Sequence, residues 1–142
     1  MAELSNQQKK ALRKLQASKP LCVAGLGKAE SFLLNYISFE AQARRVLHYY
    51  RCRDKIRAES KAGIPIAELK KAMDHFAIPF DEVKLNALLD SKLDKRNGKS
   101  ARNLRNGMVH QWLEADCKEV EKRFDEFFPY FREFDAAIRR VL

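Results

Sequence analysis

The stretch GKAESFLLNYISFEAQARRVLHYYRCRDKIRAE, residues 27–59, determines the fold that we expect. Its apolar residues recur every three or four positions, which is the period of an α-helix with one face against a core. These residues are Phe32, Leu33, Tyr36, Ile37, Ala43, Val46, Leu47 and Tyr50. The sequence Gly63-Ile64-Pro65 then ends the segment. A long amphipathic helix must bury its apolar face against other elements, so residues 27–59 predict the centre of a helical protein.

On both sides of this segment, the same period and the usual start and stop signals predict further helices over about 4–17, 65–76, 79–93, 100–127 and 129–142. Ser5 and Ser100 are expected N-caps, because a serine side chain can accept a hydrogen bond from a free N–H of the first turn. Phe128-Pro129 is expected to separate the last two helices, because proline inside a helix removes a hydrogen bond and clashes with the preceding turn. The expected fold is all-α: an up-and-down helical bundle dominated by two long antiparallel helices, with extra short helices.

The chain has 142 residues, which predicts one domain over residues 1–142. Cys22, Cys52 and Cys117 are odd in number and widely spaced, with no CxxC and no cluster of zinc-ligand spacing, so we expect reduced thiols and no metal. The first residues are too polar for a signal peptide, so we expect none, and no apolar stretch in the sequence is long enough to span a membrane. These features predict a cytoplasmic protein.

The net charge of +9 favours polyanions as partners, and RNA is the polyanion that we expect. The charge is concentrated in KLDKRNGKSARNLR, residues 92–105, where six basic residues accompany one acid. The expected RNA-binding residues of this segment's first half are Lys92, Lys95, Arg96 and Lys99. A basic, solvated loop without a ligand is the alternative interpretation.

The segment SARNLRNGMVHQW, residues 100–112, carries the residues most suited to chemistry. Arg102 and Arg105 have forked donors that match phosphate oxygens, and they fall in the first turns of a helix, where free N–H groups also favour anions. Histidine is the side chain best suited to proton transfer near neutral pH, so His110 is the candidate proton-transfer group. A phosphate-binding group and a proton-transfer group together are what cleavage of RNA by its own 2′-hydroxyl requires. The simpler interpretation is an exposed histidine and arginines paired with acids one turn away.

The segment from Arg105 to His110, RNGMVH, resembles the R-x4-6-H signature of HEPN domains, with a polar residue directly after the arginine. Upstream, the segment from Glu40 to Arg45, EAQARR, resembles the E-x3-[KR]-[KR] pattern on an earlier long helix of several HEPN groups. Glu40 could instead form an ordinary salt bridge with Arg44 or Arg45. The resemblance covers most of the chain, and residues 60–99 would be a variable helical insertion.

The resemblance implies a homodimer whose two motifs form one composite cleft, and a metal-independent endoribonuclease that uses no cofactor and leaves a 2′,3′-cyclic phosphate. His110 would act as general acid or base, Arg105 would stabilise the charge developing on phosphate, and Asn106 would orient His110 or contact the sugar. Glu40 and Arg44 would hold Arg105 in place. Such proteins often belong to defence or toxin–antitoxin systems, which makes an antitoxin a candidate partner.

Two other functions are also consistent with the sequence. One is a non-catalytic HEPN module that binds nucleotide or RNA or docks on a nucleotidyltransferase, and the other is a basic helical adaptor. Positions five apart on an ideal helix lie roughly 140° from one another, so Arg105 and His110 do not share a face. Unless a helix distortion or a partner subunit brings them together, Arg102 is the better phosphate ligand.

Overall fold

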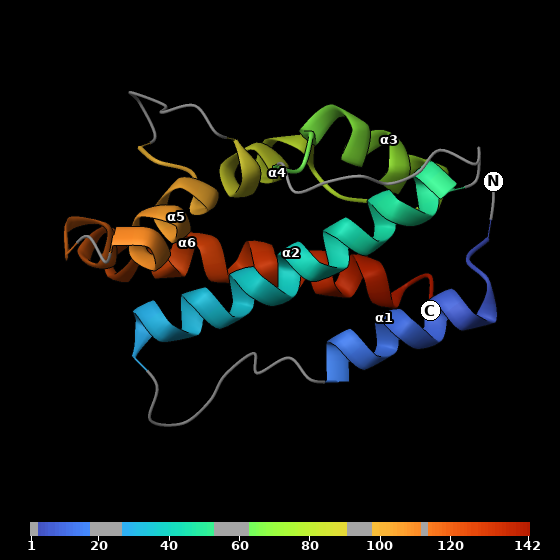
Figure 1. Cartoon of the computed structure of the whole chain (residues 1–142), viewed down its shortest axis with the longest axis horizontal. Helices are drawn as coiled ribbons and strands as arrows, with labels where there is room; N and C mark the ends of the chain where they lie inside the picture. Colours follow the sequence, from blue (N-terminus) through green and yellow to red (C-terminus); the bar gives the residue numbers. More distant parts are fainter. Residues whose placement is uncertain (1–2, 18–26, 53–62, 91–97, 112–113) are drawn as a thin grey trace.

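In the computed structural model, the described residues are 3–17, 27–52, 63–90, 98–111 and 114–142, with the side chains of 15–17 left aside. Each regular element in these ranges is an α-helix, so the predicted all-α class is confirmed. The helices are α1 (Asn6–Ala17), α2 (Lys28–Cys52), α3 (Ile66–His75), α4 (Glu82–Leu89), α5 (Ala101–Gln111) and α6 (Glu114–Arg139). Figure 1 shows α2 and α6 as the two long helices, with α1 beside α2 and α3 and α4 near one another.

The helix starts follow their local sequence. Ser5 Oγ accepts from Gln8 N at 3.2 Å while Ser5 N donates to Gln8 Oε1 at 2.9 Å, a reciprocal cap that begins α1. Asp81 Oδ1 accepts from Val83 N at 2.8 Å and caps α4. Ser100 Oγ accepts from Asn103 N at 3.2 Å, so both predicted serine caps are confirmed.

The buried core includes aliphatic side chains from every helix, and between α2 and α6 it contains a cluster of tilted and edge-to-face aromatic rings. The Phe131 ring contacts three rings of α2. Its centroid lies 5.9 Å from that of Phe32, 6.3 Å from that of Tyr36 and 5.8 Å from that of Phe39. Phe39 is completely buried although it lies outside the predicted apolar stripe, because α2 packs against four other helices rather than one. Ile37, predicted to face the core, is instead 53% exposed.

The two long helices run in the same direction, which differs from the antiparallel pairing that we expected. Phe32 contacts Phe127 and Phe39 contacts Phe134, so the contacting positions rise together along both helices. Figure 1 agrees, since both ribbons progress along the sequence toward the same end of the molecule. Three helices lie between α2 and α6 in the chain, and they return it to the N-terminal end of α2. The alternation of an up-and-down bundle therefore does not apply to this pair.

The predicted break at Phe128-Pro129 is wrong, because α6 continues through Pro129 to Arg139. Proline removes one helical hydrogen bond, but Phe127 on one side of it and Phe131 on the other are both buried against α2. Burial of these rings offsets the lost bond. The long predicted helix ends earlier instead: α5 stops at Gln111 and α6 begins at Glu114, while residues 112–113 lie outside the described residues.

In the described part of the chain, no helix has the length and apolar character needed to cross a membrane. The predicted extension of the first long helix over 53–59 falls outside the described residues, as do Lys92, Lys95 and Arg96.

Candidate functional site

Five of the predicted site residues come together in one small pocket between α2 and α5, which we call the arginine pocket. Its volume is about 120 Å³. Its lining consists of Tyr36, Glu40, Arg44, Gly63, Ile64, Leu89, Arg102, Arg105 and Asn106. On α2 the contributing residues lie four positions apart, and on α5 they lie three or four apart, so each set occupies one face of its helix.

The start of α5 is fixed in space by hydrogen bonds that also position the pocket's arginines. Ser100 Oγ donates to the carbonyl of Asp90, at the end of α4, while capping its own helix. This joins α4 to α5 at the point where Leu89 and Arg102 enter the pocket. Gly63 completes the wall, because a Cβ there would lie only 2.3 Å from a terminal nitrogen of Arg102. Glycine at this position lets the Arg102 guanidinium lie directly against the backbone, and a larger residue would require the guanidinium to move.

Glu40 lies between two guanidinium groups. Its Oε1 accepts from Arg44 Nε at 3.0 Å, and its Oε2 lies 4.0 Å from a terminal nitrogen of Arg105. The second distance is too long for a hydrogen bond, so Glu40 acts on Arg105 through charge rather than direct contact. Arg105 is oriented mainly by Asn106, whose Oδ1 accepts from its NH1 at 2.7 Å, and by the Tyr36 ring 5.7 Å below its Cζ.

Tyr36 is a member of the pocket that the sequence placed only in the core. It is 1% exposed, and burial together with the Glu40 carboxylate raises the pKa of its phenol far above the ordinary value, although Arg105, Arg102 and Arg44 oppose this. The hydroxyl therefore stays protonated at neutral pH. The sequence could have indicated this role, because Tyr36 lies four residues before Glu40 and so on the same face of α2.

The lining residues include three arginines and one glutamate, so the formal charge of these side chains is +2. Within the described residues, Arg102 has no hydrogen-bond or ion-pair partner, and Arg105 Nε is buried without one. A buried donor without a partner costs free energy that a bound anion would recover. The pocket therefore has the charge and the donors of an anion site.

His110 does not line the arginine pocket. It is exposed in the last turn of α5, whereas Arg105 faces α2. The angle of roughly 140° expected between the two positions is not removed by any bend of α5, which is one continuous helix. A single chain thus separates the proton-transfer group from the phosphate-binding groups.

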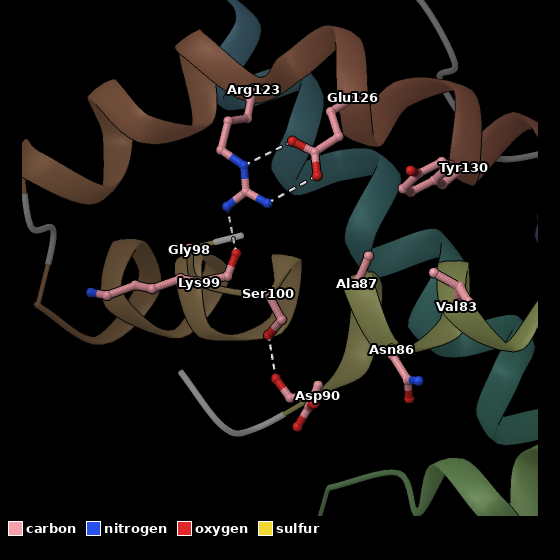
Figure 2. A pocket seen from close by; sticks show the side chains of 10 residues that line it. All are labelled: Val83, Asn86, Ala87, Asp90, Gly98, Lys99, Ser100, Arg123, Glu126 and Tyr130. Atoms are coloured by element: carbon pink, nitrogen blue, oxygen red, sulfur yellow. Dashed lines mark hydrogen bonds and ion pairs between the residues drawn. The ribbon is translucent and has the colours of Figure 1, made fainter. Parts of the chain in front are cut away.

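A second, larger hollow of about 450 Å³ lies between α4, the 98–100 segment and α6. Figure 2 shows Arg123 there, pointing from α6 toward Lys99. Its guanidinium donates to both carboxylate oxygens of Glu126, at 2.9 and 3.0 Å, and to the carbonyl of Lys99. The Lys99 ammonium, a predicted RNA contact, binds buried Asp116 at 2.9 Å. These charges hold α5 to α6, so we take the arginine pocket as the functional site.

Comparison of the chain with models of known protein families, with curated protein sequences and with solved structures gave no significant match.

Proposed function

We propose that this protein binds RNA and holds one of its phosphate groups in the arginine pocket. The observation that carries the proposal is Arg102, a half-buried guanidinium that lines the pocket with no hydrogen-bond or ion-pair partner in the described part of the chain. An arginine left without a carboxylate beside two other arginines is suited to a phosphate, whose oxygens accept forked hydrogen bonds.

The charge of the whole chain supports RNA as the source of that phosphate. The net charge is +9, and the basic stretch 92–105 leads directly into α5, whose first turns supply Arg102 and Arg105. Basic side chains along the path of a nucleic acid strengthen binding by releasing its counterions. The resemblance of residues 105–110 to the HEPN signature points to the same class of ligand.

The test is RNA binding measured by fluorescence anisotropy with a labelled single-stranded oligonucleotide. We expect Arg102→Ala to weaken binding roughly tenfold, because a hydrogen bond to a charged group contributes about 1.5–3 kcal/mol. The slope of log affinity against log salt should also fall by about 0.7, the value for one phosphate contact on a single strand.

The matched control is Arg140→Ala, which removes the same charge from an exposed position outside the pocket. We expect it to bind within about twofold of the wild type, because exposed charges act only through screened attraction. Equal losses from the two variants would contradict a role for the pocket and leave only general attraction between the basic protein and RNA.

A specific observation favours ribonuclease activity as a second candidate function. Val109, beside His110, is 51% exposed, and Ile37 of α2, one turn before Glu40, is 53% exposed. Exposed apolar side chains on the two helices that carry the pocket could be covered by a second copy of the chain. We propose that such a copy would bring its His110 to the phosphate, as the HEPN resemblance implies. An antitoxin or nucleotidyltransferase partner stays a prediction of that resemblance.

The measurement for this candidate is cleavage of an RNA pool in EDTA by the wild type and by His110→Ala. If His110 transfers a proton, the variant should lose at least about a hundredfold in rate while it still binds RNA, and wild-type products should end in 2′,3′-cyclic phosphate. Binding without cleavage by either protein, in samples shown to be dimeric by analytical ultracentrifugation, would leave the binding function alone.

A further inference from the structure

The size of the arginine pocket restricts what can enter it. At about 120 Å³ it is well below the roughly 300–1,000 Å³ of pockets that enclose drug-sized ligands. A nucleobase with its ribose is too large for this space, whereas a single phosphate group is not. The ligand must therefore present a compact anion and leave the rest of its structure outside.

The charge of the pocket distinguishes two kinds of phosphate. The lining side chains Arg44, Arg102, Arg105 and Glu40 have a formal charge of +2, and Tyr36 adds a protonated hydroxyl without adding charge. A phosphodiester within an RNA chain carries one negative charge. A phosphomonoester carries about −1.5 to −2 at pH 7, because its second pKa is about 6. The pocket therefore matches the charge of a monoester more closely than that of a diester.

The position of the donors leads to the same ligand. The Nε of Arg105 is buried and has no hydrogen-bond partner among the described residues, and the guanidinium that carries it lines the pocket, so an anion that binds this guanidinium from the pocket enters the space between α2 and α5. A phosphate inside an RNA chain is joined to riboses on both sides, and both must stay outside. A terminal phosphate has one ester bond and can be inserted with the chain leaving in one direction.

Resting on the proposed RNA-binding function, we propose that the arginine pocket binds the terminal phosphomonoester of an RNA strand. Arg102 is the residue with the largest effect on this preference, because it brings a guanidinium that no carboxylate of the described chain neutralises.

The experiment compares four labelled RNAs of identical sequence. Each end, 5′ and 3′, carries either a phosphate or a free hydroxyl, which gives the four combinations. We expect one phosphorylated end to bind the wild type roughly tenfold more tightly than its hydroxyl counterpart, and the preferred end identifies which terminus enters. Arg102→Ala should remove this preference, and Arg140→Ala should keep it. Equal affinity for all four RNAs, or a preference that survives Arg102→Ala, overturns the proposal.

The pH dependence of the preference tests the charge argument separately. The charged and titratable groups lining the pocket are Tyr36, Glu40 and Arg44 from α2, and Arg102 and Arg105 from α5; no described histidine lines it. As pH rises from 5.5 to 7.5 the monoester loses its second proton, so its binding should tighten severalfold. RNA with hydroxyl ends should not show this change. A preference of constant size over this range overturns the match of charges.

These results separate failure of this inference from failure of the proposed function. If every RNA binds equally and Arg102→Ala weakens all four alike, the pocket holds a phosphate within the chain, and only the terminal preference is wrong. If Arg102→Ala and Arg140→Ala are indistinguishable on every RNA, the pocket does not bind RNA at all.

Discussion

Replacing Phe131 with alanine is expected to lower the free energy of unfolding by about 3–5 kcal/mol, the usual effect of removing a buried phenylalanine ring. Phe131 is 1% exposed, and its ring contacts three rings of α2, so the cavity left behind would open in the middle of the core. Since whole domains have only about 5–15 kcal/mol of stability, this is a large fraction of the total. Urea unfolding followed by circular dichroism measures it.

The matched control is Phe128→Ala on the same helix. Phe128 is only half-buried and stacks on Phe124 at 5.2 Å, so its removal leaves little cavity and should cost clearly less than Phe131→Ala. Because Tyr36 contacts Phe131 and also lines the arginine pocket, we further expect Phe131→Ala to weaken RNA binding, and Phe128→Ala to leave it unchanged. Equal destabilisation by the two variants would contradict a core centred on Phe131.

Gly107→Ala is the second large effect, with an expected loss of about 2 kcal/mol in the free energy of unfolding. A Cβ at this position would lie 1.7 Å from Asp116 Oδ2 and 2.8 Å from its Cγ, so the carboxylate must move. Asp116 is 4% exposed and binds Lys99 at 2.9 Å, and movement would break this pair. Breaking a buried ion pair costs about 3–5 kcal/mol. The half-exposed Lys99 lowers that cost, and the better helix propensity of alanine returns about 1 kcal/mol.

A double-mutant cycle gives the decisive comparison for Gly107. In an Asp116→Ala background the clash no longer exists, so the same Gly107→Ala change should be neutral or stabilise the protein by about 1 kcal/mol. An identical loss in both backgrounds would show that the close approach of α5 to α6 at Gly107 does not depend on Asp116. Urea unfolding of the four proteins supplies the measurement.

Local sequence was sufficient to predict most helices and their starts. The serine caps at Ser5 and Ser100, the proline before α3 and the 3.6-residue period all act over one to four positions, which is the range that sequence patterns describe. Pro129 was misjudged for the same reason. Its local effect opposes a helix, but rings from α2, more than eighty positions away in the chain, keep α6 continuous.

The candidate site was predicted in part. Glu40, Arg44, Arg102, Arg105 and Asn106 all line one pocket, because the residue types that bind phosphate were recognisable in two helices. Asn106 accepts a hydrogen bond from Arg105, and its expected role beside His110 or at the sugar stays a prediction. Gly63 and Leu89 could not be predicted as lining residues from the sequence, because a glycine and a leucine are common in any helical protein.

The sequence by itself determined that the chain is helical, where most helices begin, and which residues have the chemistry to bind a phosphate. These properties depend on backbone propensity and on side-chain type, which neighbouring residues set. Only the tertiary structure decided that α2 and α6 run in the same direction, that three arginines converge, and that His110 lies outside their pocket. Those properties depend on packing between helices tens of residues apart, where small rotations about a helix axis change which side chains meet.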